Sequence, residues 1–116
     1  MAELISIRKR TAQRKDASAD ALNEYASLLL TCEPNDLRDP KAALPIALTA
    51  NELTDHQNPV YLDTLSLAYH LTGDTAKAIV NQKEAIALLP RGESSLRADV
   101  EAALAKFEAA LEDESK

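Results

Sequence analysis

The chain has 116 residues, the size of one small domain, and a formal net charge of −6. Alanine and leucine contribute 21 and 18 of these residues, whereas valine and isoleucine together contribute eight and glycine only two. Because sheets favour β-branched and aromatic side chains, this composition argues against a β-rich fold and predicts one all-α domain over residues 1–116.

The sequence has the features of a soluble protein from a reducing compartment. No apolar run approaches the roughly 20 residues that span a bilayer, and the longest candidate stops after Leu30. The basic N-terminal residues are followed by polar ones and not by the apolar core of a secretory signal. Since the lone cysteine, Cys32, cannot form an internal disulfide, we expect a cytoplasmic protein with no membrane partner.

The net charge is unevenly distributed along the chain. Residues 1–15 carry a local charge of +4, and residues 16–116 carry −10. The acidic body repels phosphate backbones, and no aromatic side chain lies near the basic segment, so we expect no nucleic-acid partner. We interpret the basic cluster, Arg8–Lys15, as a solvated helix face or a frayed terminus.

A weak helix is predicted over about 2–15 and a stronger one over about 17–31. The second has one buried face, because its apolar residues recur at three- and four-residue intervals. These residues are Ala21, Leu22, Tyr25, Ala26, Leu28 and Leu29. Asp16 or Ser18 can cap its start, and Pro34 ends it by excluding helical geometry from the residue before it.

A third helix is predicted from the cap Asp39, with Pro40 at the first helical position, toward Leu53. Pro45 lies inside this helix, where it removes a backbone hydrogen bond. We expect a kink or a late start at that point and not a break. Residues 55–59 are predicted to form a loop.

The second half of the chain begins with a helix-turn-helix unit. One helix is predicted over about 60–72, and another runs from Asp74 or Thr75 until Pro90 ends it. Between them, Gly73 is expected to take the left-handed conformation that closes a helix.

A last helix is predicted from Ser94 or Ser95 to about Leu111, with its apolar residues on one side. Residues 112–116 are mostly charged and are expected to form a solvated tail.

Two parts of the chain repeat each other. Residues 39–44 align with residues 74–79 at an offset of 35, and both open a helix with a small residue followed by an aliphatic one. Upstream, an offset of 40 matches four residues of the second helix with four of the fourth. The pairs are Leu22 with Leu62, Tyr25 with Leu65, Ala26 with Ser66 and Leu29 with Tyr69. The difference of five is an insertion in the first turn, at residues 32–38.

With this pattern the chain resembles the tetratricopeptide repeat family. The residues that carry the resemblance are Leu62, Leu65, Ser66, Tyr69, Gly73, Asp74, Ala78, Ala85 and Pro90. The resemblance implies a right-handed superhelix of about two helix-turn-helix units, the first over 17–53 and the second over 59–90. A flanking N-terminal helix precedes them, and a capping helix over 94–111 closes the array. The first unit departs from the family pattern in its longer turn, which lacks the glycine, and in Pro45.

Two runs of sequence also look like a bacterial subgroup of this family. Residues 28–40 and 61–74 are similar to repeat segments found in larger multidomain proteins. We therefore expect the chain to be a segment of such a protein or a small repeat protein of the same type.

No catalytic or metal-binding pattern is found in the sequence. The two glycines cannot form a phosphate-binding loop, and His56, His70 and Cys32 lack metal-ligand spacing. We therefore expect no enzymatic activity, no cofactor and no metal. A small-ligand or catalytic protein that uses His70, Asp63 and Cys32 is the third and weakest alternative.

The resemblance also implies a binding surface, because the first helix of each tetratricopeptide unit lines a concave groove. The residues expected on that face are Asn23, Ser27, Leu30, Val60, Asp63, Leu67 and His70. Neither helix supplies the lysines or arginine of the subclass that grips a chaperone's C-terminal carboxylate. An acidic tail is therefore a poor ligand, and a neutral or basic protein segment is favoured. The alternative is that several of these residues contact only water.

Two other functions rank ahead of that third alternative. The first is a protein-interaction module that binds a peptide or a helical segment in the concave groove. The second is a scaffold or oligomerisation module that forms a homodimer through exposed helix faces.

Overall fold

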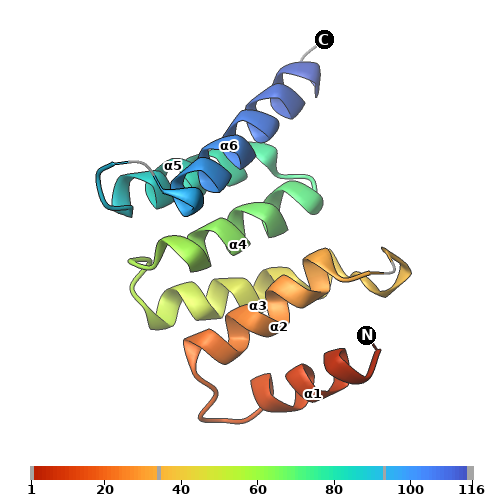
Figure 1. Cartoon of the computed structure of the whole chain (residues 1–116). Helices are drawn as coiled ribbons and strands as arrows, with labels where there is room; N and C mark the ends of the chain where they lie inside the picture. Colours follow the sequence, from red (N-terminus) through yellow and green to blue (C-terminus); the bar gives the residue numbers. More distant parts are fainter. Residues whose placement is uncertain (1, 34, 93, 115–116) are drawn as a thin grey trace.

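The computed structural model describes residues 2–33, 35–92 and 94–114, and these residues form six α-helices and one short 3₁₀ turn (Figure 1). The elements are α1 (Ala2–Ala12), α2 (Ala19–Thr31), η1 (Asn35–Leu37), α3 (Pro40–Leu53), α4 (Pro59–Leu71), α5 (Thr75–Leu88) and α6 (Ser95–Glu114). No strand occurs among the described residues, so the all-α prediction is confirmed. None of the helices in these ranges is long and apolar enough to cross a membrane.

Five of the helices begin at a polar side chain that accepts a hydrogen bond from a free backbone N–H of the first turn. The five caps are Ser18, Asp39, Asn58, Asp74 and Ser94, with donor–acceptor distances of 2.9–3.2 Å. Ser18 and not Asp16 therefore starts α2. The caps predicted for the third helix, the fifth and the last are confirmed.

Two helix ends differ from the prediction. The first helix stops at Ala12, because Arg14 donates to the Thr11 carbonyl at 3.4 Å in a turn and residues 13–15 have no apolar surface to bury. The last helix continues to Glu114 through part of the expected tail, since glutamate is a good helix former and no breaker occurs there. Residues 115–116 lie outside the described ranges.

The helix through Pro45 is continuous from Pro40 to Leu53, so it is not broken, as expected, and it does not start late. The ring of Pro45 lies on the exposed side of the helix, so the backbone hydrogen bond that proline removes is not a buried one. Upstream, α2 ends at Thr31 with extended backbone at Cys32. The role predicted for Pro34 falls outside the described residues.

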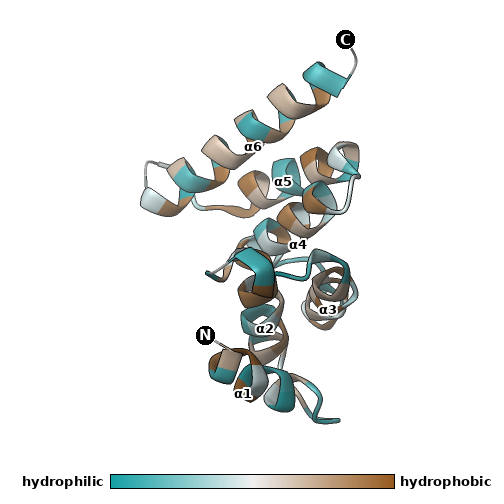
Figure 2. Ribbon diagram, turned by 90° about the vertical axis from the view of Figure 1, so that its right-hand side faces the viewer, coloured by the Kyte–Doolittle hydropathy of each residue, from teal (hydrophilic) through white to brown (hydrophobic). Residues whose placement is uncertain are grey.

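The helices stack in chain order, so α1 and α6 lie at opposite ends of the molecule (Figures 1 and 2). The most extensive packing is within the pairs α2–α3 and α4–α5, and α2 also contacts α4. Six alanines of these four helices are fully buried: Ala26, Ala43, Ala47, Ala68, Ala78 and Ala85. Leu62 and Leu65 fill the centre of α4, which is covered by neighbours on both sides.

The two helix pairs are anchored in the same way at their turns. Asp74 N–H donates to the carbonyl of Tyr69 at 2.8 Å, and Asp39 N–H donates to the carbonyl of Leu29 at 2.8 Å. These donors and acceptors are the residues that the two sequence offsets pair with each other. The five-residue insertion therefore does not change this contact: in both pairs, the start of the second helix is hydrogen-bonded to the equivalent residue of the first helix.

Arg38 replaces the missing glycine in the longer turn. Its Nε donates to the Cys32 carbonyl at 2.7 Å, and its Nη2 donates to the Thr31 carbonyl at 3.3 Å and to Glu33 at 2.9 Å. A basic side chain can satisfy the free carbonyls at a helix C-terminus, so this turn needs no left-handed residue to close α2.

Candidate functional site

A hollow of about 510 Å³ lies between α4 and α6. Its walls are Asp63, Leu67, His70 and Leu71 from α4 with Asp99, Ala102, Ala103, Lys106 and Phe107 from α6. We call it the α4–α6 hollow. Three of the predicted groove residues meet here with residues of the last helix.

Helical spacing explains how the walls form. Asp63, Leu67 and His70 follow each other at four- and three-residue intervals, so their side chains share one face of α4. The facing residues of α6 include Ala102 and Ala103, whose short side chains leave the space open. The hollow therefore results from small residues of one helix opposite longer residues of another.

The carboxylate of Asp63 is held by the buried amide of Gln82. The Gln82 Nε2 donates to Asp63 Oδ1 at 2.7 Å and to the Val100 carbonyl at 2.9 Å, which ties α5 to both walls of the hollow. Burial raises the pKa of Asp63 above its usual value of 3.8, and the negative charge of Asp99 raises that pKa further, while the Gln82 bond opposes both. Asp63 Oδ2 accepts no hydrogen bond from a described residue.

His70 and Phe107 close the other end of the hollow. Their ring centroids are 4.9 Å apart, and His70 Nδ1 lies 3.0 Å from the hydroxyl of Thr75 at the start of α5. Lys106 is also in this wall and forms no ion pair with a described residue. The hollow is thus acidic at the Asp63–Asp99 end, and it has imidazole and ammonium groups about 10 Å along the helices.

Asn23 and Ser27 line a different hollow, of about 320 Å³, between α1 and α2. Arg8 and Glu24, which form an ion pair of 2.9 Å, also line this hollow. Asn23 is 7% exposed, and its Oδ1 has no hydrogen-bond partner among the residues that the structure describes. The two hollows share no residue, so the residues expected on one groove face are divided between two places on the molecule.

The remaining two predicted groove residues lie in neither hollow. Leu30 is 2% exposed and belongs to the core formed by α2, α3 and α4, so its assignment to a binding face is corrected. Tertiary packing turns this side of α2 inward. Val60 is 42% exposed in the first turn of α4.

The α6 wall of the hollow was not among the predicted site residues. The sequence nonetheless contains a signal for this wall. At an offset of 36 residues, Asp63 aligns with Asp99 and His70 aligns with Lys106. Phe107, predicted only as an apolar residue of the last helix, is both core and wall.

The α4–α6 hollow has both polar and apolar walls. Its polar groups are two carboxylates, one imidazole and one ammonium, above an apolar floor, and none of the wall residues is a serine, threonine or cysteine nucleophile. Within the described ranges, no group of three or more His, Cys, Asp or Glu side chains is placed to hold a metal ion. Cys32 is buried at the end of α2, away from this hollow.

Comparison of the chain with protein-family models, with curated proteins and with solved structures finds no match. A functional assignment therefore depends on the geometry and charge of the hollows themselves.

Proposed function

We propose that this protein is a tetratricopeptide-type interaction module that binds a short peptide or helical segment of another protein. The repeated sequence pattern and the matching anchors of α2–α3 and α4–α5 support this class. The proposal places the protein in the cytoplasm, where a single thiol such as that of Cys32 stays reduced.

The observation that carries the proposal is the composition of the α4–α6 hollow. A space of about 510 Å³ accommodates one or two side chains of a partner. Leu67, Leu71 and Phe107 form an apolar surface, and the carboxylates of Asp63 and Asp99 lie beside it. Such a site fits a segment with an apolar residue followed by a lysine or arginine.

The basic residue of the partner is expected to bind at Asp63. One oxygen of this carboxylate is already fixed by Gln82, so the side chain is oriented before a ligand arrives. A charge-assisted hydrogen bond to the other oxygen in a desolvated site contributes about 1.5–3 kcal/mol. An acidic segment is disfavoured, because it meets two carboxylates in a body that is already negative.

Selection from a random peptide library tests this function. The parent chain should enrich peptides in which a basic residue lies beside an apolar one. Asp63→Ala should lower the affinity for the selected peptides by about ten- to a hundred-fold, because it removes the charge-assisted hydrogen bond. Asp99→Ala should lower that affinity less. Asp36→Ala, in the exposed 3₁₀ turn, removes the same charge elsewhere and should leave the affinity unchanged.

The melting temperature of each variant is measured beside its affinity. Asp63→Asn keeps the oxygen that accepts from Gln82, so it should melt close to or above the parent while it also weakens binding, which separates a loss of binding from a loss of fold. Enrichment of acidic peptides, or peptides that bind Asp63→Ala and the parent equally, would contradict the proposed site.

A further inference from the structure

The first helix has an exposed apolar side chain on its outer face and a basic C-terminal end. Among its described residues none is buried, and it contacts α2 through Ile5, Ala12 and the Arg8 ion pair. On the opposite face, Ile7 is 51% exposed, and Glu3, Ser6 and Arg10 lie around it. The exposed cations of this segment, Lys9, Arg10, Arg14 and Lys15, form no ion pair with the described residues.

The last helix has an outer face of the opposite charge. Val100 and Phe107 turn toward the core, and the exposed residues on the other side are small or acidic. These residues are Ala98, Glu101, Ala105, Glu108, Ala109 and Glu112, of which Glu101 also forms an ion pair of 3.2 Å with Arg97. Their intervals of three and four place them on one face, where short alanine side chains permit the close approach of another helix.

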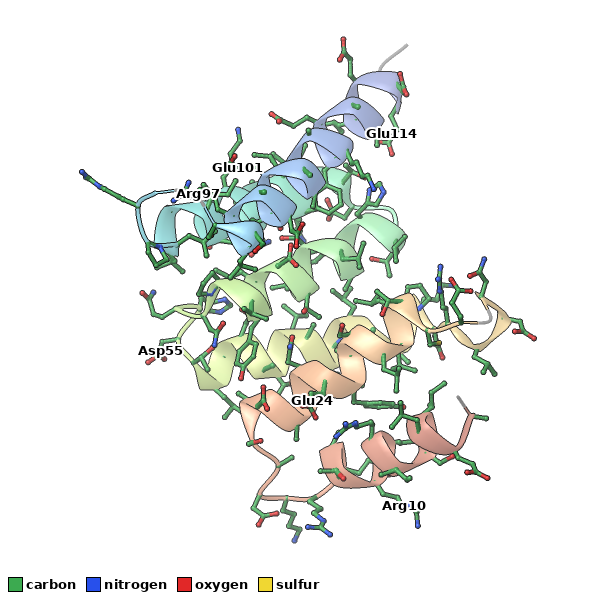
Figure 3. The ribbon with its side chains drawn as sticks, viewed as in Figure 1. Arg10, Glu24, Asp55, Arg97, Glu101 and Glu114 are labelled. Atoms are coloured by element: carbon green, nitrogen blue, oxygen red, sulfur yellow. The ribbon has the colours of Figure 1, made fainter. Side chains whose placement is uncertain are left out.

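The two faces cannot meet within one molecule. The outer end of the stack at α1 and the outer end at α6 lie on opposite sides of the body, as Figure 1 shows. In Figure 3, Arg10 lies at the lower end and Glu101 and Glu114 at the upper end. The element pairs in appreciable contact do not include α1 with α6.

We infer that the outer face of α1 in one molecule binds the outer face of α6 in a second copy of this chain, head to tail. This inference goes beyond the proposed function and does not use the α4–α6 hollow. The resulting helix pair repeats the arrangement of α2–α3 and α4–α5, in which each helix is covered by the next. The basic segment finds the acidic residues that its own molecule cannot bring to it.

A second copy fits the basic segment better than a phosphate-rich partner does. Residues 16–116 carry a charge of −10, which repels a nucleic acid or an anionic membrane brought close to the molecule. The same acidic residues attract a segment of charge +4. Opposite charge and exposed apolar surface are therefore both satisfied by self-association.

The contact is expected to be weak and sensitive to salt. A helix of 11 residues is only about 16 Å long, so the buried area falls at the low end of specific interfaces. Because a head-to-tail contact leaves a free α1 and a free α6 at the ends, association continues as the concentration rises.

Sedimentation velocity of the full chain tests the inference. At low ionic strength, about 20 mM salt, the weight-average mass should rise between about 0.02 and 1 mM protein, and about 300 mM salt should reduce that rise. A monomer throughout this range at low salt would overturn the inference. Binding of the monomer to anionic vesicles or nucleic acid through α1 would assign the basic face to a different partner.

Charge reversal identifies the two faces. Lys9→Glu with Arg10→Glu on α1, or Glu108→Lys with Glu112→Lys on α6, should each raise the dissociation constant about fivefold or more. Mixing these two variants should restore association, because each then offers the charge that the other needs. A chain with all four changes should also associate, and its net charge is −6, as in the parent.

The matched control for the α6 variant is Glu52→Lys with Glu84→Lys. It makes the same change in net charge as the α6 variant, at exposed positions of α3 and α5. These changes should leave the association of the parent intact. If the control weakens association as much as the α6 variant, or if mixing fails to restore it, the two faces do not pair. Circular dichroism of each variant confirms that α1 and α6 remain helical.

Discussion

Asp63 is an acidic side chain that lies partly buried among three helices. Its own helix is α4, the amide that binds it comes from α5, and the neighbouring carboxylate comes from α6. Burial has the largest effect on its pKa and raises it. The folded state therefore binds this proton more tightly than the unfolded state does, so ionised Asp63 opposes folding at neutral pH.

This sign leads to a prediction for stability. Asp63→Asn keeps the oxygen that accepts from Gln82 and removes the buried charge, so it should melt at or above the parent temperature at pH 7. The difference should narrow as the pH falls through the raised pKa of Asp63, because the parent side chain then becomes neutral as well. Thermal melts over a pH series measure both. If Asp63→Asn melts below the parent by the same amount at every pH, the prediction is contradicted.

A second prediction concerns the neighbours of Asp63. Gln82→Met removes the hydrogen bond that stabilises the carboxylate, so the pKa of Asp63 should rise further. Asp99→Asn removes a negative neighbour, so that pKa should fall toward 3.8. Carboxyl-carbon NMR titrations report the two midpoints. Asp36→Asn serves as the control and should leave the Asp63 midpoint unchanged.

At the scale of single elements, the α4–α5 turn depends on glycine for conformational reasons alone. Gly73 has φ of +98°, as expected for a residue that closes a helix in the left-handed region, and a Cβ there would meet no atom within 4 Å. Gly73→Val should therefore lower the free energy of unfolding by about 1–2 kcal/mol through backbone strain. Gly73→Asn should cost less, because asparagine tolerates positive φ. If urea unfolding shows the same loss of unfolding free energy for Gly73→Val and Gly73→Asn, backbone strain is not the cause.

The crossing of α4 and α5 provides a prediction about packing. Ala78 is fully buried in α5, which packs extensively on α4, so Ala78→Leu should overpack its surroundings and destabilise the fold by about 1–3 kcal/mol. Ala76→Leu, at an exposed position of the same helix, is the matched control and should change stability little. A melting temperature of Ala78→Leu within about a degree of the parent would show that this crossing tolerates a larger residue.

At the scale of the whole molecule, stability is expected to decrease from the centre of the stack toward α1. The central helix α4 is covered by α3, α5 and α2, whereas α1 packs mainly on α2 and buries none of its described residues. Amide hydrogen exchange should therefore be slowest in α4 and fastest in α1 among the helices. Equal protection of the two helices would indicate that the molecule opens as one unit and not from its end.

The sequence alone determined the local features of this protein. Asp39 and Asp74 each cap a helix because a carboxylate accepts from a free N–H of its own first turn, and Gly73 closes α4 through its own backbone freedom. Such interactions involve residues a few positions apart, so their spacing in the sequence predicts them. Among the site residues, the shared face of Asp63, Leu67 and His70 was predictable on the same ground.

Only the tertiary structure decided which surfaces are open. Each central helix packs against neighbours on more than one side, so apolar spacing does not say that Leu30 faces the core while Leu67 lines a hollow. The position of α6 over α4 depends on contacts between residues far apart in the chain, including the bond from Gln82 to the Val100 carbonyl. The hollow and its acidic end exist because that packing brings Asp99 beside Asp63, and no local rule of helix formation specifies it.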